Sequence, residues 1–188
     1  MPRNPEDARI RLRHAALELF AEHGFDQTTA AQIAARAGVT ERTFFRHFPD
    51  KREVLFDGQA VLGTALTEAI GEAAAKLTPM EVMRQAFAAV TPMLEANRPF
   101  SEPRHRIIAT TPALQEREIA KGTALVGIVG AALRQRGVEP RQASLAAQIG
   151  MAVFGHALTG WFAAPGSSLQ DHLDRGFAEL QGLWGPGA

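Results

Sequence analysis

A run of polar residues near position 40 has the side chains needed to contact nucleic acid. Thr40, Glu41, Arg42, Thr43 and Arg46 lie within nine residues, TERTFFRHF. An arginine guanidinium can donate two hydrogen bonds to O6 and N7 of guanine, and a glutamate can accept one from N4 of cytosine. The polar face of an amphipathic helix would give the same pattern, so the spacing alone leaves both interpretations open.

Two short helices joined by a tight turn must position these side chains. Residues 28–51 read TTAAQIAARAGVTERTFFRHFPDK, and we expect a positive φ at Gly38 in the turn. Thr40 is expected to cap the second helix through its hydroxyl, with Phe44 and Phe48 on the buried side because they lie four residues apart. This spacing is typical of a helix-turn-helix, whose second helix lies in the major groove of DNA.

The pattern continues on both sides of this motif. AALELFAEHGFDQTT leads into it at residues 15–29, and FRHFPDK at residues 45–51 follows the polar residues 40–43. Over about residues 8–56 the chain resembles the TetR family of bacterial transcriptional regulators, whereas the rest matches only in helical character and length. The resemblance implies a homodimer that binds double-stranded operator DNA. The family often has a tyrosine where this chain has Phe45, so the phosphate contact of that phenol hydroxyl is not carried over.

The resemblance also implies contacts outside the second helix. His47 and Lys51 are expected near the phosphate backbone, with Lys51 close to the start of the next helix. The threonine that precedes the first helix of the motif and Thr43 resemble phosphate contacts of the family. The expected DNA-binding residues are therefore Thr28, Thr29, Thr40, Glu41, Arg42, Thr43, Arg46, His47 and Lys51.

The composition favours an all-α fold and excludes several kinds of site. Hydrophobic residues make up 46% of the 188 residues, with no tyrosine and few β-branched runs. The absence of cysteine excludes disulfides, cysteine-zinc sites and thiol catalysis. The six histidines lack paired-ligand spacing, and no Walker loop, dinucleotide glycine pattern or nucleophile elbow occurs, so we expect no metal, no cofactor and no enzyme activity. The net charge of zero does not itself indicate DNA binding.

Two domains and about nine helices are expected. Residues 1–50 would form the DNA-binding domain, and residues 51–188 a larger helical domain for ligand binding and dimerisation. Residues 51–76 are predicted to form one long helix with Gly58 and Gly63 in its interior. A rigid rod of this kind would connect the DNA contacts to the sensing domain, and its glycines would ease bending.

The remaining helices have clear start and stop signals. Thr78-Pro79-Met80-Glu81 combines a capping threonine, proline at the first helical position and glutamate three residues after the cap. Gly137 and Pro165-Gly166 interrupt the later apolar periodicity. The further helices are expected at residues 79–96, 102–109, 112–136, 140–164 and 168–184.

Apolar side chains of the middle helices are candidates for an effector pocket. Most of them must form core, but the resemblance implies that some line a cavity for an apolar or amphipathic small molecule. The candidates are Leu62, Leu66, Met83, Phe87, Met93, Phe100, Ile107 and Ile108.

The last two helices have more apolar faces than one core needs. Residues 140–164 are apolar on two sides, and a second apolar stripe implies a partner helix, here in a second copy of the chain. The expected dimer-interface residues are Ile149, Val153, Phe154, Leu173, Phe177 and Leu180.

The resemblance implies a ligand-released repressor, and the sequence predicts that it is cytoplasmic and does not span a membrane. The first residues are charged, and the longest apolar runs are about ten residues, half of a membrane span. The alternative is a small helical ligand carrier or enzyme in which the N-terminal motif is only structural. A salt-dependent gel shift with the promoter beside its own gene separates the two hypotheses.

Overall fold

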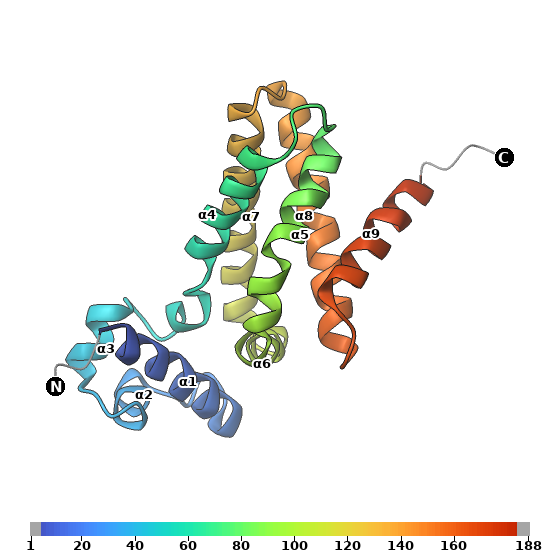
Figure 1. Cartoon of the computed structure of the whole chain (residues 1–188). Helices are drawn as coiled ribbons and strands as arrows, with labels where there is room; N and C mark the ends of the chain where they lie inside the picture. Colours follow the sequence, from blue (N-terminus) through green and yellow to red (C-terminus); the bar gives the residue numbers. More distant parts are fainter. Residues whose placement is uncertain (1–4, 184–188) are drawn as a thin grey trace. The chain divides into compact units, whose positions relative to one another are not determined.

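The computed structural model describes the backbone of residues 5–183 and the side chains from residue 7 to residue 183. Within that range the secondary structure consists of α-helices and one 3-10 helix, η1, which confirms the predicted all-α fold (Figure 1). The elements are α1 Pro5–His23, α2 Ala30–Arg36, α3 Glu41–His47, η1 Glu53–Phe56, α4 Gln59–Glu72, α5 Pro79–Ala96, α6 Arg98–Ala109, α7 Pro112–Gln135, α8 Pro140–Ala163 and α9 Leu169–Leu183.

The chain divides into two compact units, each built from two separate segments of the sequence. Met1–Gln59 and Arg98–Ala120 form the first, called here the N-terminal unit, and Ala60–Asn97 and Lys121–Ala188 form the second, the C-terminal unit. This division by packing does not follow the expected functional boundary after residue 50, because residues 98–120 return to the N-terminal unit. The assignment of DNA binding to residues 1–50 stays a prediction about function.

The core of the N-terminal unit draws on segments far apart in the sequence. Leu12 of α1, Ile33 of α2 and Phe44 of α3 are fully buried, and Leu114 of α7 joins the same cluster. Phe100 and Ile108 of α6 are also buried there. The helix-turn-helix therefore packs on a core that its own sequence does not complete.

Charged side chains fix the returning segment within the N-terminal unit. Arg104 of α6 donates to the Leu55 carbonyl of η1 and pairs with Glu118 of α7. Arg117 Nε donates to Glu53 Oε1 at 2.7 Å, which ties α7 to η1 a second time. The two ion pairs are partly shielded from water, so they contribute more than fully exposed pairs of the same length.

The predicted continuous helix over residues 51–76 is wrong. Residues 51 and 52 form a turn, η1 covers Glu53–Phe56, and α4 begins only at Gln59. Gly58 lies between η1 and α4, and Gly63 lies inside α4, where an added Cβ would be 3.3 Å from Ile128 Cδ1. No single rod therefore runs from Lys51 into the C-terminal unit, and Gly63 serves the packing of α4 against α7.

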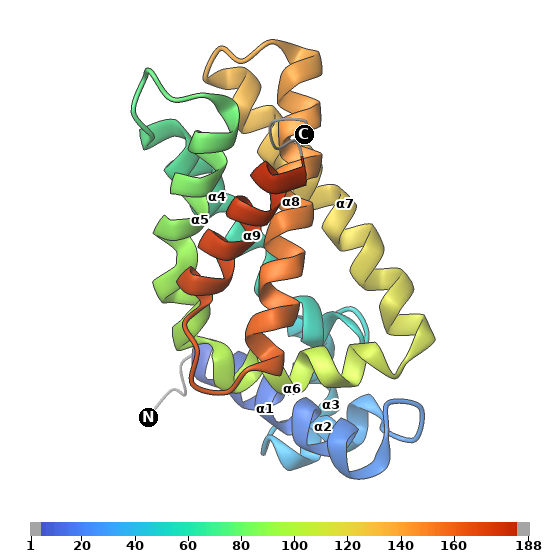
Figure 2. The same cartoon turned by 90° about the vertical axis from the view of Figure 1, so that its right-hand side faces the viewer.

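The C-terminal unit is a helical bundle whose core contains large side chains. Leu66 and Ile70 of α4 are fully buried, as are Phe87 of α5 and Trp161 of α8. The Phe87 ring stacks on that of Phe154 with centroids 4.7 Å apart. Helices α5, α8 and α9 lie side by side (Figure 2). This arrangement buries apolar faces of α8 and α9 inside one chain.

The predicted start of α5 and the predicted end of α7 are confirmed. Thr78 Oγ1 accepts from the Glu81 N–H at 3.4 Å, and Glu81 Oε2 accepts from the Thr78 N–H at 2.7 Å, the reciprocal bonds of a capping box. Hydrogen bonds from the Thr78 hydroxyl and from the Thr78 N–H to the carboxylate lower the pKa of Glu81. Gly137, with φ of 97°, ends α7. A cap that the sequence did not indicate is Glu95 of α5, whose Oε1 accepts from the Leu169 N–H at the start of α9.

Two glycines inside long helices are expected to respond oppositely to alanine. A Cβ at Gly150 of α8 would lie 2.6 Å from Met83 Cε and 3.2 Å from Met83 Cγ, and Met83 is fully buried. Gly150→Ala should therefore lower the free energy of unfolding by about 1–3 kcal/mol through overpacking. Gly127→Ala in α7 meets no atom within 4 Å and should raise it by about 0.5–1 kcal/mol. Urea unfolding measures both, and a Gly150→Ala protein at least as stable as Gly127→Ala would contradict this packing.

Candidate DNA-binding surface

The turn between α2 and α3 is fixed by backbone bonds and one arginine. Gly38 has φ of 66°, and the Val39 N–H donates to the Ala34 carbonyl at 2.9 Å, which closes the end of α2. Arg11 of α1 donates from Nη1 to the Ala37 carbonyl at 2.8 Å. These bonds set the direction in which α3 leaves the turn, and they confirm the predicted role of Gly38.

Helix α3 has one buried face and one exposed face. Thr40 Oγ1 accepts from the Thr43 N–H at 3.2 Å and caps the helix, as predicted. Phe44 and Phe48 are 0% and 2% exposed, so the expected buried side is confirmed. Glu41, Arg42, Phe45 and Arg46 are exposed, and Thr43 and His47 are half-buried at the edges of that face.

The basic side chains of α3 differ from those around it. Arg9 pairs with Asp57, Arg36 with Glu18 and Glu22, and Arg52 with Asp50. Among the described residues neither Arg42 nor Arg46 finds a hydrogen-bond or ion-pair partner. Two guanidinium groups with all their donors available therefore project from the exposed face of α3. Anions or the acceptor atoms of base edges are the groups that they can bind.

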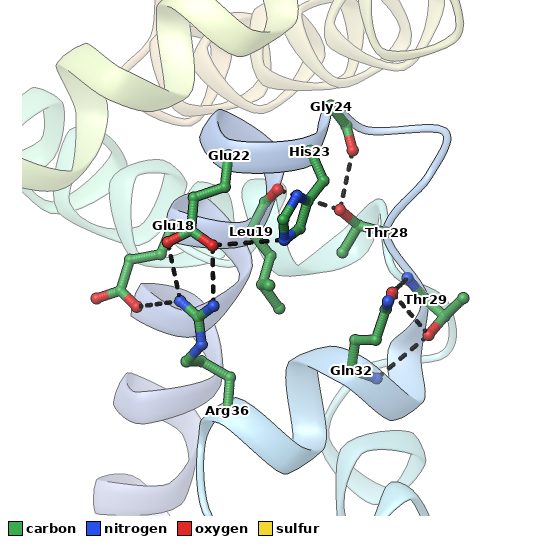
Figure 3. A network of polar contacts seen from close by, with 9 residues as sticks. All are labelled: Glu18, Leu19, Glu22, His23, Gly24, Thr28, Thr29, Gln32 and Arg36. Carbon is green, nitrogen blue, oxygen red and sulfur yellow. Dashed lines mark hydrogen bonds and ion pairs between the residues drawn. The ribbon is translucent and has the colours of Figure 1, made fainter.

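A polar network holds α2 against α1 (Figure 3). Arg36 Nη2 lies 2.9 Å from Glu22 Oε2, and Arg36 Nη1 lies 3.1 Å from Glu18 Oε2. The hydrogen bond from Arg36 lowers the pKa of Glu22. Thr29 caps α2 in a capping box with Gln32, whose Oε1 accepts from the Thr29 N–H at 2.8 Å. Thr29 is therefore the N-cap of α2, and its side chain stays exposed.

Thr28 does not fit the expected phosphate contact. Its side chain is 1% exposed. Its Oγ1 lies within hydrogen-bond distance of the Leu19 and Gly24 carbonyl oxygens, to which it can donate (Figure 3). The hydroxyl is therefore committed to closing the loop after α1, and its burial keeps it from an external phosphate. Sequence position alone did not separate Thr28 from Thr29, since both precede α2.

The Lys51 side chain also makes its hydrogen bonds within the N-terminal unit. Its ammonium donates to the carbonyls of Phe25 at 2.7 Å, Thr28 at 2.9 Å and Asp26 at 3.3 Å. It also lies 4.3 Å from the centroid of the Phe25 ring. An ammonium group has three N–H donors, and all three are directed at this loop. The structure thus shows Lys51 bonded to the α1–α2 loop, and its expected phosphate contact stays a prediction.

The eight pocket candidates are divided between the two units. Leu66, Met83 and Phe87 are buried in the C-terminal unit, Leu62 is half-buried there, and Met93 is exposed. The other three belong to the N-terminal unit, where they pack in or against its core: Phe100, Ile107 and Ile108. An effector pocket among the first five stays a prediction.

The expected interface residues occupy two kinds of position. Buried within one chain are Val153, Phe154, Leu173 and Phe177, so α5, α8 and α9 of the same protomer already cover them. Ile149 and Leu180 are only half-buried. The outer surface of these helices instead exposes Leu145 of α8 and Leu183 of α9, at 58% and 79%. Leu145 belongs to one of the two apolar stripes of α8 in the sequence, but the periodicity does not say which stripe the protomer covers.

The part of the chain that the structure describes contains neither a metal-binding cluster nor a membrane-spanning helix. No group of three or more His, Asp or Glu side chains there could hold a metal ion. None of the described helices is long and apolar enough to cross a membrane. The exposed face of α3 is the candidate site that the geometry supports.

In a comparison with known proteins, family models match both the N-terminal and the C-terminal part of the chain. Residues 12–57 match the model described as bacterial regulatory proteins, tetR family, and residues 77–184 match the MftR C-terminal domain. The chain is 40% identical over 82 residues to the HTH-type transcriptional regulator TcmR of Streptomyces glaucescens, covering 44% of this chain and 36% of TcmR. It is 29% identical over 100 residues to the proposed mycofactocin biosynthesis regulator MftR of Mycobacterium tuberculosis, covering 53% and 50%. The chain thus spans half or less of these two curated relatives.

Solved structures resemble the chain over nearly its whole length. The crystal structure of Thermus thermophilus FadR, a TetR family transcriptional repressor in complex with lauroyl-CoA, is 27% identical and covers 96% of this chain and 97% of its own, with a TM-score of 0.59. A TetR-family regulator of Syntrophomonas wolfei has a TM-score of 0.69 at 17% identity and coverage of 96% of both chains, which shows the shared fold alone.

The bonds of Lys51 predict a stability effect in place of a DNA effect. Lys51→Met should lower the free energy of unfolding of the N-terminal unit by about 1–3 kcal/mol, because charge-assisted hydrogen bonds to three carbonyls are lost. The matched control is Arg52→Met, which removes an exposed cation bonded to the adjacent Asp50. Urea unfolding and amide exchange of residues 25–30 measure the difference. If Lys51→Met matched Arg52→Met in stability but lowered the salt slope of DNA binding by about one unit, Lys51 would contact a phosphate after all.

Proposed function

Because this chain belongs to the TetR family of bacterial transcriptional regulators, we propose that it binds operator DNA through the exposed face of α3 and is released by a small-molecule effector. The observation that carries the proposal is the exposure of Arg42 and Arg46 and their lack of partners among the described residues. Both lie on a helix whose other face is fixed by Phe44 and Phe48. A helix held in this way matches the geometry by which helix-turn-helix proteins read the major groove.

The proposed contacts divide by chemistry. Arg42 and Glu41, in the first turn of α3, are assigned to base edges, where guanine offers two acceptors and cytosine one donor. Arg46 and His47 are assigned to the phosphate backbone at the other end of the helix. The hydroxyls of Thr29, Thr40 and Thr43 can donate to phosphate oxygens at the helix starts. In the free protein the Thr29 hydroxyl donates to Gln32 Oε1 at 3.1 Å, and the Thr40 and Thr43 hydroxyl oxygens lie 3.0 Å apart.

The proposed effector is apolar or amphipathic and binds in the C-terminal unit. The apolar core of this unit would favour the binding of a hydrocarbon group. Its residues include Leu66, Met83 and Phe87, and Leu62 packs against it. The relative from Thermus thermophilus was crystallised with lauroyl-CoA, an amphipathic molecule of this kind. Whatever the effector, linkage requires that it weaken DNA binding by the same factor by which DNA weakens effector binding.

The proposed assembly is a homodimer through α8 and α9. The outward surface of α8 carries Leu145, Ala152 and Gly155, and a Cβ at Gly155 would meet no atom of its own protomer within 4 Å. Small residues of this kind let a partner helix approach closely, and Leu145 and Leu183 offer apolar area around them. A two-fold dimer would present two α3 helices to a two-fold operator in the cytoplasm.

The alternative of a ligand carrier or enzyme is not favoured. Family models cover both the N-terminal and the C-terminal part of the chain, and they describe transcriptional regulators. The chain is a transcriptional regulator of this family and not an enzyme.

The DNA assignment is tested by Arg42→Ala. If Arg42 pairs with guanine, the variant should lose about 1–3 kcal/mol of operator binding and relax the preference at one base pair of each half-site. The control is Arg84→Ala in the C-terminal unit, which removes an exposed arginine paired with Asp174 and should leave binding unchanged. Gel shifts at several salt concentrations, with the promoter beside its own gene as probe, measure both. Equal affinity of parent and Arg42→Ala for every base at every position would contradict the assignment.

The dimer is tested by a large side chain at an open glycine. Gly155 is exposed, and a Cβ there meets no atom of its own protomer within 4 Å, so the fold should survive Gly155→Arg while a partner helix is pushed away. The matched control is Gly127→Arg in α7, also exposed and also open within 4 Å. Sedimentation should show a monomer for Gly155→Arg and a dimer for Gly127→Arg. A dimer of unchanged affinity for Gly155→Arg would remove this part of α8 from the interface.

A further inference from the structure

One large apolar side chain lies on the same face of α3 as the arginines. The Phe45 side chain is 52% exposed, although Phe44 and Phe48 of the same helix are buried. Residues 41, 42 and 45 lie on one face because they are three or four positions apart in a helix. The surface assigned to DNA therefore has an aromatic ring between its charged groups.

The ring of Phe45 packs against a buried ring of the same helix. It packs edge-on against the fully buried Phe44 ring, with centroids 5.3 Å apart and an interplanar angle of 85°. Aromatic pairs favour this T-shaped geometry. The backbone beneath it is fixed as well, by the Thr40 cap and the burial of Phe48. The ring thus presents a fixed apolar surface to the solvent.

A phenyl ring is chemically selective in a DNA groove. It carries no donor or acceptor, so it cannot bond a phosphate and cannot satisfy the polar atoms of guanine, cytosine or adenine edges. The major-groove edge of thymine alone bears an apolar group, the C5-methyl. Placed against any other edge, the ring would remove water from polar atoms without replacing their hydrogen bonds.

We propose that Phe45 is a specificity-determining residue that reads the C5-methyl group of a thymine in each operator half-site. The proposal rests on the proposed DNA binding by α3 and adds the base that the apolar part of this surface selects. Arg42 and Phe45 would then read different chemistry from one short helix: acceptor atoms on one base pair and a methyl group on another.

The test changes only the methyl group. An operator is first selected from a randomised duplex library with the full-length parent protein, and each thymine is then replaced singly by deoxyuridine, which lacks the C5-methyl. At the position that Phe45 contacts, the parent should lose about fourfold in affinity per half-site, the effect of burying one methyl group. Because the protein is unchanged in this comparison, folding cannot account for the result.

Three variants assign the effect to Phe45. Phe45→Tyr keeps the ring and should keep the discrimination between thymine and deoxyuridine, whereas Phe45→Ala should bind both equally at that position. Phe45→Leu keeps an apolar contact and should retain part of the discrimination. The ring is exposed, so none of these changes removes a core residue, and circular dichroism checks each fold.

Each other outcome has a distinct meaning. Equal affinity of the parent for every thymine and deoxyuridine duplex would overturn the inference, as would a selected operator that lacks thymine in its half-sites. Discrimination that persists unchanged in Phe45→Ala would assign the methyl group to another residue and overturn it as well. A selection that enriches no sequence would instead overturn the proposed DNA binding, and the inference with it.

Discussion

The arrangement of this protein depends on the burial of two phenylalanine rings. Helix α3 has seven residues, and isolated helices below about 12–15 residues are only marginally stable in water. Phe44 and Phe48 supply the missing stabilisation, because burying one large apolar side chain contributes about 1.5–3 kcal/mol. Their positions decide which way the helix faces. Arg42, Phe45 and Arg46 are exposed as a consequence of that constraint.

The core that receives these rings is assembled from two distant parts of the chain. Phe100, Ile108 and Leu114 come from a segment that follows α5, yet they complete the cluster around α1 to η1. Arg104 and Arg117 fasten that segment to η1. The same helix α7 contributes Leu125 and Val129 to the core of the C-terminal unit. One continuous helix therefore contributes side chains to both cores.

Local features could be predicted from the sequence, because their causes lie within a few residues. The caps at Thr40 and Thr78 and the glycine turns at Gly38 and Gly137 each depend on neighbours up to four positions away. The buried side of α3 follows from its periodicity in the same way. Family resemblance, and not composition, supplied the function, since a net charge of zero carries no such signal.

The sequence does not reveal contacts whose partner lies far along the chain. Lys51 bonds to carbonyls 23 to 26 residues away, and nothing in the local pattern distinguishes that role from a phosphate contact. Phe154 stacks on Phe87, a residue of another helix, so a stripe that suggested a partner subunit is covered by its own chain. The long helix predicted from Lys51 failed because the short 3-10 helix η1 packs Val54, Leu55 and Phe56 into the core and requires a turn before α4.

The central claim is that the exposed face of α3 is the surface that reads DNA. A crystal structure of the full chain with its selected operator duplex tests it most directly. The account predicts α3 in the major groove, with the Arg42 guanidinium within hydrogen-bond distance of a base edge and the Lys51 ammonium still bonded to the loop after α1. A complex in which α3 faces solvent while another surface contacts the duplex would contradict it.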